Sequence, residues 1–274
     1  MSTRAALIDE DGKATTDNYN IRAAQRALQA LDLFATQNAF IGVTELQQAL
    51  GINSNMAFRI LYTLEKSRYI VLNPETGKYH LSLKVLALGK VATASLTITK
   101  VASPHLKLLS AELKKVNVVM FVYEHGDLII AEKIDSKRLP KVYAHVGRLM
   151  PLHATAAGKM LASSLDETEL EAMLGHNGLD SYTPTTITDM EEFKKEMAGV
   201  RQTQLAWEKE EHIQNLNGVA AAIRDKHGKV VAAVCINGFT NNVTLPELEQ
   251  MTGTLLDFTY NISETMSYVG SQAF

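Results

Sequence analysis

The sequence predicts an α+β protein: an N-terminal winged helix-turn-helix domain, a linker helix, and a C-terminal domain with an antiparallel sheet flanked by helices. Three observations support this fold class. Two short amphipathic segments meet at Gly51, and a pair of β-prone runs follows them. From Asn117 the spacing of apolar residues changes from helical to alternating. The length of 274 residues favours about two domains.

The N-terminal part begins with a polar stretch, residues 1–18, which has no apolar periodicity and which we expect to be a disordered tail. We assign residues 19–81 to the winged domain. Apolar residues at helical spacing predict a first helix over residues 21–36. A second helix, from Val43 to Leu50, is followed after a very short turn by a third helix. The turn is too short for antiparallel packing, so these two helices must cross steeply, as in a helix-turn-helix.

The third helix presents polar and aromatic side chains on the face opposite its apolar stripe. Such a face can enter the major groove of double-stranded DNA. A hairpin is expected next, because residues 69–72 and 78–81 are β-prone and a Pro/Gly turn separates them. With Thr44 from the second helix and Lys78 at the wing, the expected DNA contacts are Thr44, Ser54, Asn55, Phe58, Arg59, Tyr62 and Lys78.

Some of these side chains also have an ordinary structural interpretation. Arg59 could bridge to Glu45 or Glu65 instead of contacting a guanine or a phosphate. Ser54 is equally suited to capping the third helix. For Phe58, a place in the core is favoured slightly over contact with a thymine methyl group.

The distribution of charge matters more for DNA binding than the net charge of −3. Residues 19–81 carry a net charge of only +2. Because most affinity for DNA comes from phosphate neutralisation, one such module should bind weakly. We therefore expect a homodimer, in which two modules act together.

A linker helix is expected over residues 82–98, with an apolar stripe formed by Leu83, Leu86, Ala87 and Val91. This stripe could pack on its copy in a dimer or on the winged domain, and the sequence favours neither.

Residues 99–274 form the C-terminal domain. We expect a helix from Pro104 to Lys115, strands over 118–123 and 127–134, and a helix capped by Asp166 with Glu169. Thr188 with Glu191 repeats that capping pattern. A second hairpin over 219–223 and 229–236 and a long helix from Pro246 complete the domain.

With these elements placed, the chain resembles the IclR (isocitrate lyase regulator) family of transcriptional regulators from about Ile21 to its last helix. The resemblance rests on the order and spacing of several short motifs: Arg26-Ala27-Leu28, Thr44-Glu45-Leu46, Arg59-Ile60-Leu61-Tyr62-Thr63-Leu64-Glu65, Gly77-Lys78-Tyr79-His80-Leu81, Val146-Gly147-Arg148, the stretch from Pro151 to Lys159, and Glu210-Glu211. It implies a GAF-like effector domain and DNA-binding dimers that commonly pair into tetramers.

The sequence departs from the family pattern at positions that bear on DNA reading. Ser54 and Met56 stand where Lys and Thr are usual at the start of the recognition helix, and Arg68 replaces a Gly after it. A left-handed turn costs a non-glycine residue about 1 kcal/mol. Arg68 therefore either contacts DNA or lies in a different turn. Gly218 stands where many members have Cys.

The resemblance also implies a pocket for a small-molecule effector, lined by Leu139, Val142, Ala156, Ala157, Glu208, Leu216, Gly218, Cys235 and Asn237. Free N–H groups at the start of a helix from Ala156 could hold a carboxylate. No arginine falls at these positions, and Glu208 argues against a strongly anionic ligand. A small organic acid, an aromatic metabolite or a neutral effector remains open. Tight helix packing for the alanines and a buried hydrophobic role for Cys235 are the structural alternatives.

Two other functions are considered. An enzyme could use Cys235 as a nucleophile with His153 or His227 as its base, but nothing in the sequence brings them together. A sensory module without DNA binding is the other alternative. We found no metal-ligand spacing among the histidines and no cofactor motif, so we expect no metal, no cofactor and no catalytic residue.

The composition predicts where such a protein acts. It contains no run of about 18 apolar residues, no N-terminal apolar segment and a single cysteine. We therefore expect a cytoplasmic protein that does not span a membrane. The favoured function is a ligand-responsive regulator of transcription, more in keeping with a repressor than an activator.

Overall fold

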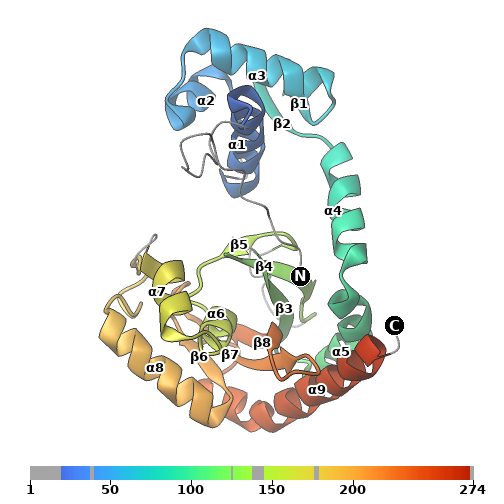
Figure 1. Cartoon of the computed structure of the whole chain (residues 1–274), viewed down its shortest axis with the longest axis vertical. Coiled ribbons are helices and arrows are strands. Elements are labelled where there is room, and N and C mark those ends of the chain that lie inside the picture. The colour runs from blue at the N-terminus through green and yellow to red at the C-terminus, as the bar shows by residue number, and fades with distance from the viewer. Residues whose placement is uncertain (1–19, 38–39, 125, 138–144, 176–178, 272–274) are drawn as a thin grey trace, which may run out of the picture. The chain divides into compact units, whose positions relative to one another are not determined.

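The computed structural model describes residues 20–37, 40–124, 126–137, 145–175 and 179–271. The chain divides into two compact units, with the boundary between Val91 and Ala92 (Figure 1). The predicted tail, residues 1–18, lies outside the described residues. Each unit is described by itself below.

The N-terminal unit is a winged helix-turn-helix. It contains the helices α1 (Arg22–Gln37), α2 (Val43–Leu50) and α3 (Ser54–Lys66) and a hairpin of β1 (Ile70–Asn73) and β2 (Lys78–Leu81). These elements share one core, in which Phe34, Leu46 and Leu61 are buried. Ala57 is fully buried in this core, where its small side chain lets α3 pack closely on its neighbours.

The turn between α2 and α3 depends on two residues. Gly51 ends α2 in the left-handed conformation at φ 60°, which glycine adopts without steric cost. Asn53 then caps α3, since its side chain accepts a hydrogen bond from the Met56 backbone N–H at 2.8 Å. The alternative role of Ser54 as the cap was therefore wrong: Ser54 is the first residue inside the helix.

The turn after α3 is left-handed at Arg68, whose φ is +63°. Arg68 thus occupies the conformation that a glycine favours. The alternative in which this turn differs from the family pattern was wrong, because the chain keeps the turn and carries its strain.

Helix α4 (Lys84–Ser95) leaves its apolar stripe uncovered. Leu83 is 86% exposed and Val91 is 71% exposed, and Leu86 is exposed as well. Packing of this stripe on the winged domain was one of two alternatives, and the structure contradicts it.

The C-terminal unit is built on a six-stranded antiparallel sheet in the order β5-β4-β3-β8-β7-β6, as the predicted fold class requires. The strands are β3 (Asn117–Glu124), β4 (Asp127–Ile134), β5 (Leu149–Met150), β6 (Ala206–Lys209), β7 (Leu216–Arg224) and β8 (Val230–Phe239). The two predicted hairpins, β3–β4 and β7–β8, meet where β3 pairs with β8. Of the predicted turn between β3 and β4, His125 lies outside the described residues.

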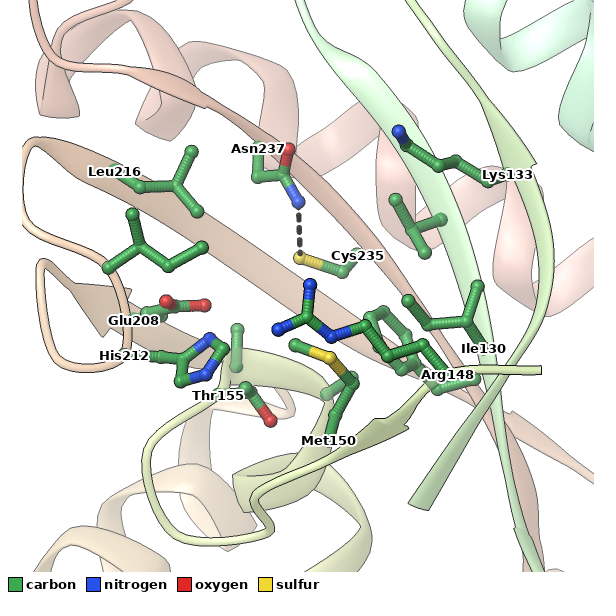
Figure 2. Close-up of a pocket in the computed structure, with 15 residues that line it drawn as sticks. Ile130, Lys133, Arg148, Met150, Thr155, Glu208, His212, Leu216, Cys235 and Asn237 are labelled. Atoms are coloured by element: carbon green, nitrogen blue, oxygen red, sulfur yellow. Dashed lines mark hydrogen bonds between the residues drawn. The ribbon is translucent and has the colours of Figure 1, made fainter. Parts of the chain in front are cut away.

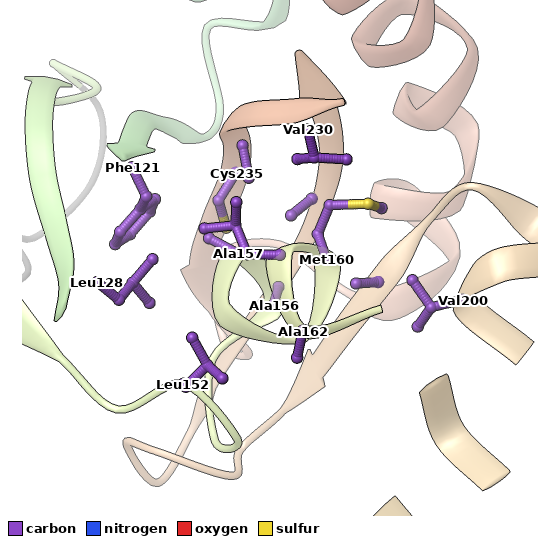
Figure 3. Packing of buried hydrophobic residues seen from close by; sticks show 14 of the residues in the cluster. Phe121, Leu128, Leu152, Ala156, Ala157, Met160, Ala162, Val200, Val230 and Cys235 are labelled. Carbon is purple, nitrogen blue, oxygen red and sulfur yellow. The ribbon is translucent and has the colours of Figure 1, made fainter. Parts of the chain in front are cut away.

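Alternate residues of each strand enter two separate cores. On one face, Val118 and Met120 pack with helices α5 (Thr97–Leu113) and α9 (Leu245–Ser271). On the other face, Val119 and Phe121 pack with α6 (Ala156–Ala162), α7 (Glu167–Gly175) and α8 (Met190–Thr203). Figure 3 shows how the small residues of α6 let this helix lie close to the sheet. The helices on both faces match the predicted arrangement.

Several element boundaries differ from those predicted. Helix α5 begins at Thr97 and contains Pro104, so the start predicted at Pro104 was wrong. Helix α8 is capped by Asp189, which accepts from the Glu192 N–H at 2.8 Å, and not by Thr188. The predicted capping of α7 by Asp166 with Glu169 is confirmed by reciprocal hydrogen bonds. Strands β5 and β6 are too short to show a periodic pattern and were missed.

Among the described residues, no single helix has both the length and the apolar composition needed to cross a membrane. Two helical segments joined by a bend, Lys84–Ala92 and Thr97–Leu113, reach that length and composition only when they are taken together.

Candidate DNA-binding and effector-binding sites

The exposed face of α3 carries most of the predicted DNA contacts. Ser54, Asn55 and Arg59 are exposed along the first two turns of the helix. Neither predicted intramolecular bridge forms: Arg59 has no ion-pair partner among the described residues, and Glu45 pairs elsewhere. A guanidinium at such a position can reach base edges or phosphates.

The aromatic residues of α3 extend this face. Phe58 is 52% exposed and Tyr62 is 49% exposed, so the favoured place of Phe58 in the core was wrong. Their rings stack with centroids 6.2 Å apart, and Lys66 Nζ lies 5.3 Å from the centre of the Tyr62 ring. The core side of α3 is filled by Ala57, Ile60 and Leu61, which leaves Phe58 on the outside.

The remaining two predicted contacts lie on neighbouring elements. Thr44 is exposed near the start of α2. Lys78 Nζ lies 2.5 Å from Glu45 Oε1, and this hydrogen bond lowers the pKa of the Glu45 carboxyl. Lys78 is thus tied to the first turn of α2, a pairing that sequence reasoning did not find. A phosphate contact from Lys78 would compete with Glu45 for the ammonium group.

The C-terminal unit contains a small cavity between its sheet and the start of α6 (Figure 2). The described side chains leave about 30 Å³ of free volume, room for one or two water molecules. Strands β3 and β4 provide an apolar wall with Val119, Phe121 and Ile130. The predicted residues that line the cavity are Ala156, Ala157, Glu208, Leu216, Cys235 and Asn237.

The other predicted effector residues are placed differently. Gly218 does not line the cavity. A Cβ at this position would lie 3.2 Å from Cys235 Sγ, so a larger residue here would press on a side chain that does line it. Leu139 and Val142 lie outside the described residues. Asn237 is held by the amide of Asn117, which donates to Asn237 Oδ1 at 3.2 Å.

Glu208 is the buried acid of the cavity. Burial raises its pKa to about 8, and the nearby carboxylate of Glu211 adds to this shift, whereas hydrogen bonds from the backbone N–H groups of Ala156 and His212 oppose it. Glu208 Oε1 is buried and has no hydrogen-bond partner among the described atoms. The first backbone N–H of α6 therefore already donates a hydrogen bond to the Glu208 carboxyl group. The expectation that this helix start holds the effector carboxylate was therefore wrong for Ala156.

Two cations line the cavity beside these residues. Arg148 comes from the loop before β5 and Lys133 from β4, and Figure 2 shows the Arg148 guanidinium between Glu208 and the apolar wall. No arginine occurs at the predicted pocket positions, but the structure adds Arg148 to the lining of the cavity. The Val146-Gly147-Arg148 motif was the sequence signal, but its distance along the chain from the other pocket residues concealed its role.

His212 also reaches the cavity. Burial lowers its pKa to about 4, and the positive charge of Arg148 contributes to that shift. The imidazole is therefore neutral at physiological pH. The cavity thus combines cationic groups, a neutral imidazole and a carboxyl group that is largely protonated near pH 7, next to an apolar wall.

The arrangement offers no activated nucleophile. Cys235 is fully buried, and burial raises the pKa of its thiol, which disfavours the thiolate that catalysis needs. His153 Nε2 lies 2.9 Å from the backbone oxygen of Asp180, which fixes that ring in place. Within the described ranges, no cluster of three or more potential metal ligands occurs.

An exposed recognition helix in one unit and a polar and apolar cavity in another define a class of protein: DNA-binding regulators with a separate domain for a small molecule. Two family models match this division. The IclR helix-turn-helix domain matches residues 23–74, and the bacterial transcriptional regulator IclR C-terminal domain matches residues 90–264. The chain belongs to the IclR family of transcriptional regulators.

Individual relatives agree with this assignment. The chain is 30% identical over 248 residues to the HTH-type transcriptional regulator XynR of Escherichia coli, covering 90% of this chain and 98% of that protein. It is also 30% identical over 226 residues to the HTH-type transcriptional repressor AllR of Escherichia coli, covering 81% of this chain and 82% of that protein. An IclR homologue from Microbacterium hydrocarbonoxydans, solved in complex with 4-hydroxybenzoate, shares the fold with a TM-score of 0.72 and 20% identity, covering 89% of this chain and 98% of that one.

Proposed function

We propose that this protein is a ligand-responsive repressor that binds operator DNA through α3 and is controlled by a small organic acid or aromatic metabolite in its C-terminal cavity. The observation that carries this proposal is the position of Arg59 on α3. Its side chain is exposed and forms no ion pair with a described carboxylate, whereas the opposite face of the helix is buried in the core. The Escherichia coli relative AllR is a transcriptional repressor, which supports this direction of regulation. On this proposal the protein is not an enzyme and acts in the cytoplasm.

The lining of the cavity favours an effector with a carboxylate. Arg148 supplies positive charge, and arginine can bind a carboxylate through two parallel hydrogen bonds. Lys133 also lines the cavity, but its ammonium group lies 2.7 Å from the Asp135 carboxylate. A protonated Glu208 adds no negative charge and can donate one hydrogen bond to a hydroxyl or carbonyl oxygen. Phe121 and Ile130 suit a compact apolar body. Because the free volume of about 30 Å³ holds only one or two water molecules, binding of such a body requires the lining side chains to move apart. The 4-hydroxybenzoate bound by the Microbacterium relative has this combination of groups.

We propose that the DNA-binding form is a homodimer or a dimer of dimers. The uncovered stripe of Leu83, Leu86 and Val91 on and next to α4 supports an interface between copies. A weakly basic module gains affinity when two copies bind the same DNA. The effector would then act by changing the spacing of two recognition helices, which must match half-sites about 34 Å or a multiple of it apart.

A gel-shift titration tests the function directly. The probe is DNA from upstream of the protein's own gene, the competitor is unrelated DNA of equal length, and the salt concentration is varied. We expect a specific band that weakens steeply with salt, because phosphate contacts release counterions. Absence of any retarded band at low salt would refute the regulator proposal.

The effector is tested separately by thermal unfolding with aromatic acids, short organic acids and glyoxylate-like compounds. A compound that binds the folded protein raises the melting temperature by an amount that grows with the logarithm of its concentration divided by its Kd. We expect an effector found in this way to release DNA in the gel shift. A compound that stabilises the protein without changing DNA affinity would contradict its role as an effector.

A further inference from the structure

A second cavity of about 380 Å³ lies within the C-terminal unit and shares no lining residue with the first. Its floor is apolar and consists of Leu152, Leu161, Val230 and the ring of Tyr123. Its rim is polar and carries the cations Arg201, Arg224 and Lys229. The function proposed above makes no use of this cavity.

The two arginines of the rim are held in fixed positions by neutral acceptors. Arg201 donates from Nε to the Ser163 backbone oxygen at 2.8 Å, at the end of α6. Arg224 donates to the Gly228 backbone oxygen at 3.0 Å and to the side-chain oxygen of Gln204 at 2.6 Å. Gln204 in turn donates to the Arg201 backbone oxygen at 2.6 Å, so one amide joins the two arginine positions.

These cations are not neutralised by the chain. Within the described ranges, no carboxylate lies within ion-pair distance of Arg201, Arg224 or Lys229. Glu169 is the one acidic residue among those that line the cavity, and its carboxylate accepts the Asp166 N–H at the start of α7. The rim therefore has a surplus of positive charge, with guanidinium groups oriented before any ligand arrives.

We propose that this cavity is a second ligand site, which binds a small oxyanion with a compact apolar body, such as an aryl phosphate or an aryl carboxylate. The arginines and Lys229 would hold the oxyanion, since guanidinium and ammonium groups form charge-assisted hydrogen bonds with phosphate and carboxylate oxygens. The apolar body would cover Leu152, Leu161 and Val230. The volume is large enough for one aromatic ring with its charged group.

The two cavities share structural elements. Phe121 of β3 lines the first cavity, and Tyr123, two residues further on the same strand, lines the second. On α6, Ala157 lines the first cavity, and Leu161, one helical turn further on, lines the second. A ligand in the second cavity therefore contacts the helix that forms part of the effector cavity.

Calorimetric titration of the full-length protein at low salt tests the site, with phenyl phosphate, benzoate and inorganic phosphate as probes. We expect phenyl phosphate or benzoate to bind more tightly than inorganic phosphate, because only they cover the apolar floor. The tighter of the two identifies the preferred oxyanion. The variants Lys229→Gln and Arg224→Gln should each weaken binding about tenfold or more.

Lys226→Gln is the matched control, since it removes a lysine from the same β7–β8 turn that does not line the cavity. It should leave affinity within about twofold, a difference of roughly 0.4 kcal/mol. Lys229 makes no ion pair among the described residues, so its replacement separates binding from folding. Arg148→Met reports on the effector cavity. The proposal is overturned if no probe binds, if Lys226→Gln weakens binding as much as Lys229→Gln, or if only Arg148→Met weakens it.

Discussion

Lys159 Nζ donates to Glu211 Oε1 at 2.6 Å, and the two side chains are only 1% and 7% exposed. This buried pair joins α6 to the loop after β6, between Glu208 and His212 along the chain, and both of these residues line the effector cavity. Lys159 also donates to the Trp207 backbone oxygen at 3.0 Å, and Thr186 donates to the Glu211 backbone oxygen at 2.6 Å. Burial raises the pKa of Glu211, and the lysine opposes that shift.

Lys159→Met should lower the free energy of unfolding of the C-terminal unit by about 3–5 kcal/mol, because it leaves the buried Glu211 carboxylate uncompensated. The double variant Lys159→Met with Glu211→Leu should recover most of that loss. Urea unfolding provides the measurement. Lys194→Met is the control: its pair with Glu171 at 3.0 Å is partly exposed, and its removal should cost less than about 1 kcal/mol. Equal losses for the two single variants would contradict the argument.

Gly158→Ala should also destabilise the C-terminal unit. A Cβ at Gly158 would lie 2.1 Å from the Leu152 backbone oxygen, so α6 would have to move away from the preceding segment. We expect a loss of about 1–3 kcal/mol in thermal or urea unfolding. Gly199→Ala in the interior of α8 is the matched control, since its Cβ meets nothing within 4 Å. That variant should be neutral or stabilising by up to about 1 kcal/mol, and an equal effect at both positions would refute the steric explanation.

Glu208 should make stability depend on pH. Its pKa is about 8 in the folded protein against an ordinary value of 4.5, so the folded state holds a proton that the unfolded state has lost between these pH values. The free energy of unfolding therefore falls progressively as the pH rises from about 4.5 to 8. Above pH 8 this loss is complete and stays constant.

Glu208→Gln removes this titration. Relative to the native protein, we expect the variant to gain stability as the pH rises, with the largest difference above pH 8. Urea unfolding of both proteins at several pH values measures that difference. The variant Glu210→Gln, at a partly exposed acid two residues further along the chain, controls for the general effect of removing a charge. A constant difference between native protein and Glu208→Gln at all pH values would contradict burial of a protonated carboxyl.

Arg59→Ala should abolish the gel shift and leave effector-induced stabilisation of the C-terminal unit intact. Arg59 is exposed and pairs with no described carboxylate, so its loss removes a DNA contact of about 1–3 kcal/mol without disturbing the core. Thermal unfolding with and without effector provides the second readout. Loss of both properties would show that Arg59 has a folding role.

Arg68→Gly should stabilise the N-terminal unit by up to about 1 kcal/mol, because glycine removes the strain of a positive φ. Hydrogen exchange of the backbone from α3 to β1 measures this change. Ser67→Gly, at the preceding residue with φ −78°, should not stabilise. Reduced DNA affinity of Arg68→Gly would identify Arg68 as a DNA contact.

The sequence predicted the elements whose periodicity is long and local. The helix-turn-helix, the wing hairpin, the two hairpins of the C-terminal unit and the last helix follow from apolar spacing. The exposed face of α3 follows from the position of Ala57 and Ile60 on its buried side. Short elements such as β5 lack a periodic signal. The true caps Asn53 and Asp189 lie one residue from the predicted ones, because several neighbouring residues could serve as caps.

The sequence by itself determined the fold class, the two-unit organisation and the family, since these depend on patterns along the chain and on the order of short motifs. The tertiary structure alone decided which distant side chains meet. Arg148 reaches the effector cavity, Lys78 pairs with Glu45, and the first N–H of α6 binds Glu208. Burial and charge at a site depend on residues brought together from different strands and helices, and their separation along the chain carries no signal of that proximity.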